Sequence, residues 1–411
     1  MAARLLLITP RNSYRIAPYL RAAKQLGIEV LVASDGEHSL IGALSEGLHI
    51  NANDLDGSVA LLQQAAGQHG FQGIIGTDDS VSELSGAIAE RLNLAGNPPQ
   101  AARYSHRKDL ARRCLQQAKV AIPDFQTLTF EQIAAGQRPH LAYPLVLKPL
   151  SLSASRGVIR VDDEAQFQRA AERIRPLLTE QNNDEERNTL LLEQFLPGQE
   201  VALEGMLDHG QLQLLTLFDK PEPLNGPFFE ESYYITPSRL PATLQAKILA
   251  VTADACRAYG LRHGPIHAEL RVNADQVWIL EVAARTIGGQ CGRLLTFGSG
   301  HTLEELVIAQ AMGKPLALKK SPEAVGVLMI PIPKAGLLRR VEGVMAAEKV
   351  PYITSLEISL YSGYELVPLP EGSSYLGFIF AKAPTPELVE AALREAHDCL
   401  KIVIAPLWKI G

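Results

Sequence analysis

The sequence has few cysteines, no long hydrophobic run and no excess of positive charge, and each shortage excludes a class of protein. Its four cysteines are spread over 411 residues without Cys-x-x-Cys spacing, so they predict neither a zinc site nor a disulfide framework. No stretch reaches the roughly 18 apolar residues that a membrane span needs. The net charge of −6 argues against a nucleic-acid partner, because phosphate binding requires a basic surface. We therefore expect a cytoplasmic protein without membrane or nucleic-acid partners.

The first 105 residues show the alternation of strands and helices that is typical of a parallel sheet. Residues 4–9 predict a buried strand, a helix ends near Leu26, and a second strand covers 28–33. A third strand, 73–77, runs into Asp78-Asp79-Ser80 and another helix. This rhythm predicts an α/β domain with helices on both sheet faces. No Gly-x-Gly-x-x-Gly follows the first strand, so a dinucleotide-binding fold is disfavoured.

After residue 105 the pattern becomes antiparallel. A helix is expected over 108–119, followed by two hairpin-like strand pairs, 145–148 with 156–161 and 200–207 with 211–218. Because an antiparallel sheet can leave one face open, we expect one face of each pair to border a cleft.

The remaining chain predicts a long loop and a small terminal domain. Prolines and a glycine in 220–227, with Pro237 beyond, predict a surface loop over 219–237. The last region, from about residue 322, ends in a helix with Thr385 as its N-cap. Its predicted apolar stripe consists of Leu388, Ala392, Ala396 and Cys399. The expected domains are 1–105, 106–313 and 314–411.

Glu269 and Glu281 are the most informative residues of the chain. The alternating flanks and the Asn-Ala-Asp turn predict a hairpin centred on Asp275, which places the two glutamates opposite each other. On the other face, Ala268, Leu270 and Val272 would then meet Val282, Leu280 and Trp278. Facing like charges destabilise a sheet, whereas a shared Mg2+ would remove that cost. The alternative is two solvated carboxylates on an exposed face.

Two lysines are candidates for phosphate binding. Lys148 ends an apolar strand and is followed by the small-residue loop Ser151–Gly157, where backbone N–H groups and hydroxyls can approach phosphate oxygens. A plain turn with an exposed lysine explains the same residues. Lys108 begins a helix, and its alternative is an ordinary charged helix face.

Two further segments carry candidate binding groups. Glu193 and Glu200 flank a bend between two apolar strands. Such a bend suits the binding of a base and a ribose. The alternative is a plain connection between two core strands. Arg285 follows Glu281 by four residues and can stabilise charge on a transferred phosphoryl group, or form a salt bridge to Glu281. Gly288 and Gly289 then permit close approach of a ligand to the backbone.

The order of these motifs resembles the ATP-grasp superfamily over residues 105–312. The segments 219–231 and 371–381 resemble L-amino-acid ligases of the bacilysin-synthetase type. The resemblance implies a multidomain α/β and α+β protein: an ATP-grasp fold with an N-terminal parallel α/β domain and a small C-terminal α+β domain.

The resemblance also implies roles for individual residues. The ATP phosphates would be held by Lys108, Lys148 and a closing loop that includes Ser153, Ser155, Arg156 and Gly157. The adenine pocket would be lined by Glu193, Gln194, Phe195 and Leu196, with Glu200 on the ribose. Glu269 and Glu281 would hold one or two Mg2+ ions, with Mn2+ as a substitute. Arg285 would act on the phosphoryl group, Gly288 and Gly289 would adjoin the acyl substrate, and Glu231 would face the metals or a substrate amino group.

Two positions depart from the family pattern. Ala283 stands where an asparagine ligand of the second metal is expected, and the phosphate loop has one glycine, Gly157, where several are common. These differences leave the number of metal ions and the mobility of the loop open.

The implied activity is an ATP-dependent carboxylate–amine ligase, with an amino acid as one substrate and an amino acid or amine as the other. Alternatives are an ATP-grasp ligase of purine or other small-metabolite biosynthesis, and a non-catalytic ATP-binding regulator. The expected partners are a small-molecule carboxylate and an amine, and homodimerisation stays open.

Overall fold

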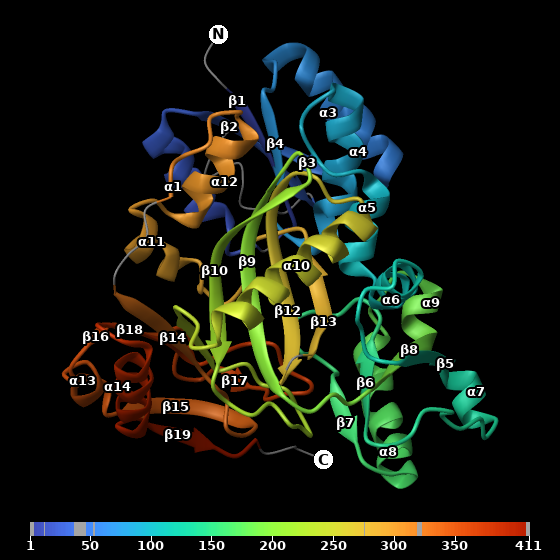
Figure 1. Ribbon diagram of the computed structural model, residues 1–411, viewed down its shortest axis with the longest axis vertical. Helices are drawn as coiled ribbons and strands as arrows, with labels where there is room; N and C mark the ends of the chain where they lie inside the picture. The colour runs from blue at the N-terminus through green and yellow to red at the C-terminus, as the bar shows by residue number, and fades with distance from the viewer. Residues whose placement is uncertain are drawn as a thin grey trace.

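The computed structural model describes residues 4–11, 13–36, 47–51, 54–274, 276–318 and 323–407. Figure 1 shows the N-terminal α/β unit at one end of the molecule, a long central sheet, and a small antiparallel sheet to one side. In the part of the chain that is described, no helix has both the length and the apolar character to cross a membrane.

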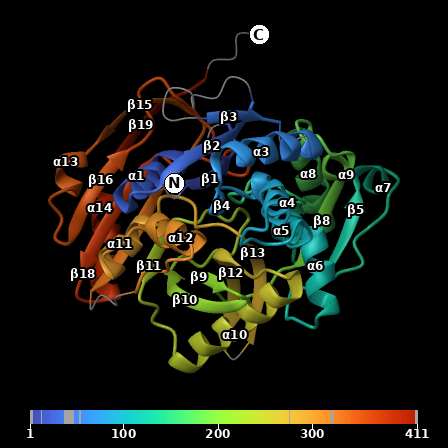
Figure 2. The same cartoon turned by 90° about the horizontal axis from the view of Figure 1, so that it is seen from above.

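The N-terminal unit is built on a four-stranded parallel sheet, as predicted. Its order is β3-β2-β1-β4. Leu5 and Leu7 pack on the α1 side while Leu6 and Ile8 pack against α3 and α4, so both faces of β1 are buried. Helices therefore cover both faces of the sheet (Figure 2). The elements are β1 (Arg4–Thr9), α1 (Ile16–Leu26), β2 (Glu29–Asp35), β3 (Gly47–Ile50), α3 (Leu55–His69), β4 (Gly73–Gly76), α4 (Ser82–Leu92) and α5 (Pro99–His106).

The small sheet has the order β5-β8-β6-β7 and is antiparallel throughout. The predicted pairing of the strand before Lys148 with the strand after Gly157 is confirmed as β6 with β7. One face of the sheet packs on α8 through Phe167 and Ile174. The elements are α6 (Lys108–Gln117), β5 (Phe125–Thr129), α7 (Phe130–Ala134), β6 (Leu145–Pro149), β7 (Ile159–Val161), α8 (Glu164–Ile174), α9 (Asp184–Asn188) and β8 (Thr189–Gln194).

The central sheet has eight strands in the order β13-β12-β9-β10-β11-β14-β18-β16. The predicted loop over 219–237 is wrong at both ends, because β10 continues to Lys220 and 233–236 form β11. The short strand β11 links β10 to β14, so the C-terminal strands extend the same sheet. The predicted domain boundaries stay a prediction. The strands are β9 (Gln199–Asp208), β10 (Gln211–Lys220), β11 (Tyr233–Thr236), β12 (Gly264–Asn273), β13 (Gln276–Ala283), β14 (Ala324–Ile330), β16 (Ile353–Ile358) and β18 (Gly377–Ala383).

The hairpin β12–β13 brings Glu269 opposite Glu281, as predicted. Its turn lies between Asn273 and Gln276, and the predicted turn centre, position 275, lies outside the described residues. A two-residue turn alone would put the glutamates out of register, but a β-bulge after Glu269 restores their pairing. Of the predicted apolar pairs, Ala268 with Val282 is confirmed, whereas the predicted partners of Leu270 and Val272 are wrong by one residue. Leu270 pairs with Ile279 and Val272 with Val277.

The C-terminal region adds a three-stranded sheet and a helix that covers β14 and β18. Thr385 caps α14 as predicted, by accepting a hydrogen bond from Leu388 N–H. The predicted apolar stripe needs correction, because Leu388 is exposed whereas Val389 and Leu393 are fully buried. The elements are β15 (Gly336–Glu342), α13 (Val344–Ala347), β17 (Glu365–Leu366), α14 (Pro386–Asp398) and β19 (Lys401–Ala405).

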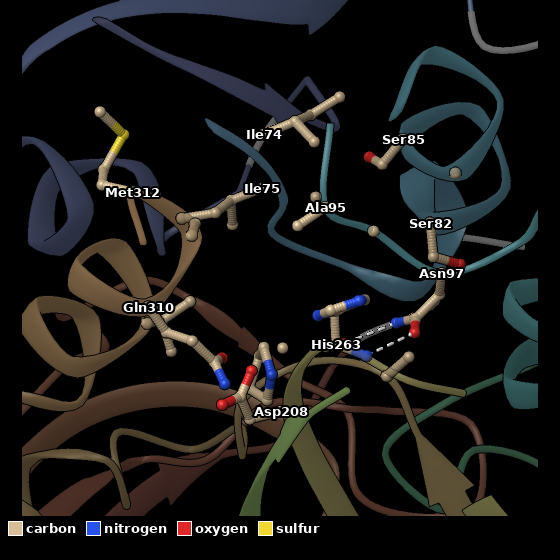
Figure 3. A pocket seen from close by; sticks show the side chains of 18 of the residues that line it. Ile74, Ile75, Ser82, Ser85, Ala95, Asn97, Asp208, His263, Gln310 and Met312 are labelled. Atoms are coloured by element: carbon tan, nitrogen blue, oxygen red, sulfur yellow. Dashed lines mark hydrogen bonds between the residues drawn. The ribbon is translucent and has the colours of Figure 1, made fainter. Parts of the chain in front are cut away.

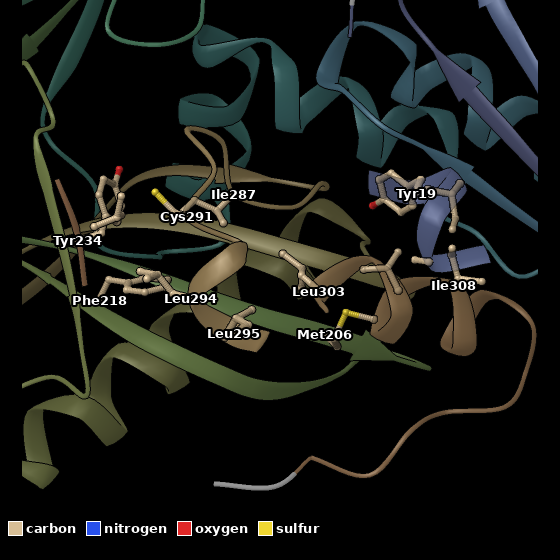
Figure 4. Close-up of a cluster of buried hydrophobic side chains, with 14 of the residues drawn as sticks. Tyr19, Met206, Phe218, Tyr234, Ile287, Cys291, Leu294, Leu295, Leu303 and Ile308 are labelled. Carbon is tan, nitrogen blue, oxygen red and sulfur yellow. The ribbon is translucent and has the colours of Figure 1, made fainter. Parts of the chain in front are cut away.

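Three helices join the N-terminal unit to the central sheet: α10 (Ala242–Tyr259), α11 (Arg293–Ser299) and α12 (Leu303–Ala311). One apolar cluster includes Tyr19 of α1, Met206 of β9 and Ile308 of α12, which lie side by side in Figure 4. This shared core fixes the N-terminal unit against the open face of the central sheet.

Candidate active site

A cavity of about 890 Å3 lies between the small sheet, the central sheet and the N-terminal unit. Its lining includes residues from all three expected domains, from Pro10 to Phe378. Most of the predicted site residues line it: Lys108, Lys148, Ser153, Ser155, Glu193, Gln194, Phe195, Leu196, Glu200, Glu231, Glu269, Glu281, Arg285, Gly288 and Gly289.

Two predicted residues do not line the cavity. Arg156 donates a hydrogen bond from Nε to the Glu371 carbonyl at 3.0 Å, and Gly157 N–H donates to the Pro370 carbonyl at 2.9 Å. Gly157 also has a φ of +73°, and a side chain there would collide with Pro149. The end of the predicted phosphate loop is therefore tied to the C-terminal region, while its beginning borders the cavity.

Glu193 holds Lys148 in place at the cavity wall. Its carboxylate accepts from Arg112 Nε at 2.7 Å and lies 2.6 Å from Lys148 Nζ. Burial by itself would raise the pKa of Glu193, but the two cations outweigh it and hold the pKa below its usual value. The acid is only 1% exposed. It therefore positions Lys148 toward the cavity from an ionised, buried site.

Glu193→Gln is expected to lower the free energy of unfolding by about 3–5 kcal/mol, because it leaves the buried Arg112 and the partly buried Lys148 without their anion. The matched control is Glu185→Gln. Glu185 is half exposed and pairs with Arg107, so its loss should cost less than about 1 kcal/mol. Urea unfolding of the two variants measures the difference.

The pH dependence of Glu193→Gln follows from the lowered pKa. An acid with a depressed folded-state pKa stabilises the fold above its unfolded pKa and loses that effect as pH falls through the folded value. The difference in the free energy of unfolding between wild type and Glu193→Gln should therefore become smaller as the pH falls. A gap that stays constant down to the acid transition would contradict the ion-pair explanation.

Lys108 and Glu281 also meet at the cavity wall. Lys108 Nζ lies 3.4 Å from the Glu281 carboxylate and donates to the Leu152 carbonyl at 2.8 Å. Arg112, one turn along the same helix, donates to the Leu280 carbonyl at the bulge. Helix α6 thus connects the loop before Ser153 to the strand that carries Glu281.

Lys220 occupies the centre of a cluster of three acids. Its ammonium group donates to Glu200 at 2.8 Å and to Glu231, and lies 3.5 Å from Glu269. The lysine is 2% exposed. The register explains part of this arrangement, because Lys220 of β10 and Arg271 of β12 both pair with Glu200 of β9. Glu200, predicted to bind the ribose, thus has both carboxylate oxygens next to cations.

The protonation of this cluster is set by burial and by its neighbours. Burial and the Glu269 carboxylate raise the pKa of Glu231 to about 8. Burial opposes charge on Lys220, but the surrounding acids outweigh it and raise its pKa. Burial likewise opposes charge on Glu269, yet Lys220 and His267 lower its pKa. Glu231 is therefore the acid of this cluster that holds a proton most readily.

The acids are spaced as for a hard divalent cation, but the Lys220 ammonium group lies among three of them. One oxygen from each of Glu200, Glu231 and Glu269 lies within 4.8 Å of the others, and Glu281 faces Glu269 across the hairpin. Oxygen ligands at such spacing suit Mg2+. Even without an ion, the ammonium group of Lys220 balances part of the negative charge of these acids.

A buried His267 connects Glu269 to the glycine loop. One ring nitrogen contacts Glu204 and the other lies 3.3 Å from Glu269. Glu204 also accepts the Ile287 N–H at 3.3 Å, immediately before Gly288 and Gly289. Although burial disfavours a charged ring, the two acids raise the pKa of His267 to about 9. This series of contacts, through His267 and Glu204, fixes the orientation of Glu269 relative to the glycine loop.

Arg285 is held by the N-terminal unit. Its Nε donates to Asp79 at 2.8 Å, and the neighbouring Arg15 donates to Asp78 at 2.8 Å. Burial disfavours charge on Arg285, but Asp79 and Glu281 outweigh it and raise its pKa. Asp78 and Asp79 both lie in the cavity wall. The alternative pairing of Arg285 with Glu281 acts at longer range, through charge alone.

The sequence analysis did not identify the buried residues that contact the site residues, although the spacing of some of them indicates a shared face. His267 and Arg271 lie two residues on either side of Glu269, so the period of a strand puts all three on one face. Arg112 follows Lys108 by four residues on a helix, which also implies a shared face. Lys220 left no such signal, because it was included in the expected loop.

Two family matches cover more than half of the chain between them. Residues 141–293 match the ATP-grasp domain, and residues 328–405 match the L-amino acid ligase C-terminal domain 2. Carnosine synthase 1 of Gallus gallus is 28% identical over 79% of this chain. Alanine–anticapsin ligase of Bacillus subtilis is 27% identical over 48% of it. These matches span 37% and 45% of the respective relatives, less than half of each.

The structure is similar to a solved one over nearly its whole length. The L-amino acid ligase from Bacillus licheniformis superposes with a TM-score of 0.84 at 25% identity, covering 98% of this chain and all of that one. The predicted fold class and family resemblance are confirmed. The chain contains an ATP-grasp domain and the C-terminal domain of the L-amino acid ligases.

Proposed function

We propose that this protein is an ATP-dependent ligase that joins the carboxylate of an amino acid to the amino group of a second amino acid or amine. The observation that carries the proposal is the convergence on one cavity of two lysines, the Glu269–Glu281 pair and Arg285. The relatives named above are amide-forming ligases by their names, which supports the same reaction class.

A carboxylate needs activation because its leaving group would otherwise be oxide. In the proposed first step, a carboxylate oxygen of the substrate attacks the γ-phosphorus of ATP and the bond to ADP breaks, which gives an acyl phosphate. In the second step, the amine nitrogen attacks the acyl carbon, phosphate leaves, and the amine loses a proton. The products are an amide, ADP and phosphate.

The residues divide this work by position. Lys108 and Lys148, which both line the cavity, are proposed to contact the phosphates, with Ser153 and Ser155 approaching from the loop. Arg285 is proposed to contact the phosphoryl group in transfer. Mg2+ held by Glu269 and Glu281 would neutralise charge on the β- and γ-phosphates. Glu231, beside Glu269, is proposed to face the same ion or the substrate amino group.

The nucleotide end of the cavity is proposed to lie at the bend after β8. Glu193, Gln194, Phe195 and Leu196 line it. The guanidinium groups of Arg160 and Arg271 lie 4.2 and 5.7 Å from the centroid of the Phe195 ring, so cation–π contacts help to position this side chain. Glu200 is proposed to accept a ribose hydroxyl while retaining Lys220.

The opposite end favours a substrate without a phosphate group. Among the described residues there, Arg15 and Arg285 already pair with Asp78 and Asp79. Apolar side chains line the same end: Ile287, Met329, Leu360 and Phe378. A phosphorylated sugar would need further cations, whereas an amino acid with an apolar side chain fits this lining.

A screen over all pairs of common amino acids tests the proposal. With Mg-ATP, we expect at least one pair to release phosphate above the rate without amino acids, and mass spectrometry of that mixture to show the two amino acids less one water. Pairs with an apolar side chain should give the strongest release. ATP binding without release for any pair would instead indicate a regulatory binding protein, and release only with another metabolite would indicate a different ATP-grasp ligase.

A further inference from the structure

A second cavity of about 420 Å3 lies behind the active site, between the N-terminal unit and the far end of the central sheet. It shares a wall with the active site, since Ala284 lines this cavity and the next residue, Arg285, lines the other. Figure 3 shows Ile74 and Ile75 on one side of the cavity, with Asp208 and His263 at the opposite edge.

Three metal-ligating side chains converge at this edge. Asp208, His209 and His263 each offer one ligand atom within 4.8 Å of the other two. The imidazole rings of His209 and His263 meet edge to face with centroids 4.8 Å apart. Nε2 of His209 lies 3.7 Å from the Asp208 carboxylate. None of the three takes part in the proposed ligase reaction.

The backbone that carries His263 is rigidly fixed. The Asn97 side-chain oxygen accepts N–H bonds from Arg262 and His263 at 2.7 and 3.0 Å, and its amide group donates to the His263 carbonyl at 2.8 Å. These hydrogen bonds appear beside His263 in Figure 3. A side chain of the N-terminal unit thus holds the start of β12 in a defined position at the cavity edge.

The position of His209 is fixed by its turn. His209 and Gly210 have φ values of +47° and +84°, as a two-residue hairpin turn between β9 and β10 requires. Gly210 N–H donates to the Arg262 carbonyl at 2.9 Å, which ties this turn to the residue before His263. The histidine backbones therefore stay adjacent, while the His209 side chain, 82% exposed, is free to rotate onto an ion.

We propose that Asp208, His209 and His263 form a binding site for a divalent transition-metal ion of the zinc type at the mouth of this cavity. Two imidazoles and one carboxylate form a donor set that suits Zn2+, in contrast to the all-oxygen set of Glu269 and Glu281. Three protein ligands leave a coordination position for water or for a ligand that enters the cavity. Arg262, next to His263 in the sequence, is exposed, so its charged side chain can extend into solvent.

Zinc titration of the full-length protein tests this site. Saturating Mg2+ and ADP are included to occupy the active-site acids. Wild type is expected to bind one Zn2+ that His209→Ala and His263→Ala each weaken by more than about tenfold, in keeping with the loss of a ligand. The control His140→Ala removes an exposed histidine far from the cluster in sequence and should titrate like wild type.

The result is independent of the ligase reaction, because the titration uses no amino acid. Crystals soaked in Zn2+ should show an anomalous peak between His209 and His263, and zinc should raise the melting temperature of wild type more than that of His263→Ala. Equal affinities for wild type and both cluster variants, or no saturable binding by wild type, would overturn the proposal. Circular dichroism without metal establishes that the variants are folded.

Discussion

Substituting glutamine for Glu281 is expected to slow phosphate release from Mg-ATP by a factor of about 10²–10³, the usual cost of one lost electrostatic contact in a transition state. Glutamine keeps the shape of the side chain but removes the charge that would hold Mg2+. Glu281 contacts Lys108 at 3.4 Å and is one quarter exposed, so the substitution leaves no buried charge unpaired. The variant should therefore fold normally and fail in catalysis.

The diagnostic readout for Glu281→Gln is its dependence on magnesium. The Mg2+ concentration that gives half the maximal rate should rise, whereas the surface variant Glu172→Gln on α8 should keep the wild-type value. Glu269→Gln should show the same defect with an added loss of stability, because Lys220 and His267 lose a buried partner. A Glu281→Gln enzyme with wild-type rate and Mg2+ dependence would refute the metal assignment.

The sequence predicted the facing glutamates because a strand repeats every two residues and a short turn joins the strands. Both features are local. The β-bulge after Glu269 was not predictable in the same way, since it adjusts the register over a single residue and is stabilised by Arg112 from a distant helix. The glutamate pair and the pair Ala268–Val282 were therefore predicted correctly, whereas the partners of Leu270 and Val272, beyond the bulge, were not.

The buried part of the site depends on pairings between distant strands. Lys220 reaches Glu200 and Glu231 only because β10 continues to residue 220, where the prolines that follow had predicted a loop. The first of these prolines follows Lys220 directly, outside the strand, so it removes no hydrogen bond from β10. The same non-local pairing through β11 joins the C-terminal strands to the central sheet, which no local pattern in the sequence indicates.

Arg285 links the active-site cavity to the N-terminal unit through its ion pair with Asp79. Asp79 stands at the end of the loop after β4 and holds Arg285 at 2.8 Å, so the position of the guanidinium depends on packing between two units of the fold. The sequence predicted the arginine from its spacing to Glu281. It did not indicate that Asp79 holds this arginine, because the two residues lie 206 positions apart.

Arg285→Met is expected to reduce kcat by about 10²–10³ while changing the KM for ATP much less, because the guanidinium is proposed to meet charge that develops during phosphoryl transfer. Arg285→Lys should recover part of the rate, since it keeps the charge but loses the planar donor geometry. Hydroxylamine trapping of the acyl phosphate separates the first step from the second, and the defect should appear in the first.

Asp79→Asn tests whether the position of the Arg285 guanidinium group matters in addition to its charge. This variant keeps the guanidinium but replaces the anion that holds it, so we expect a smaller loss in kcat than for Arg285→Met. Because the two side chains are in contact, their effects should not add in the double variant. If Asp79→Asn and Arg285→Met instead lowered kcat independently, or if Arg285→Met raised only the KM for ATP, Arg285 would be a ground-state binding residue and the phosphoryl-transfer role would be wrong.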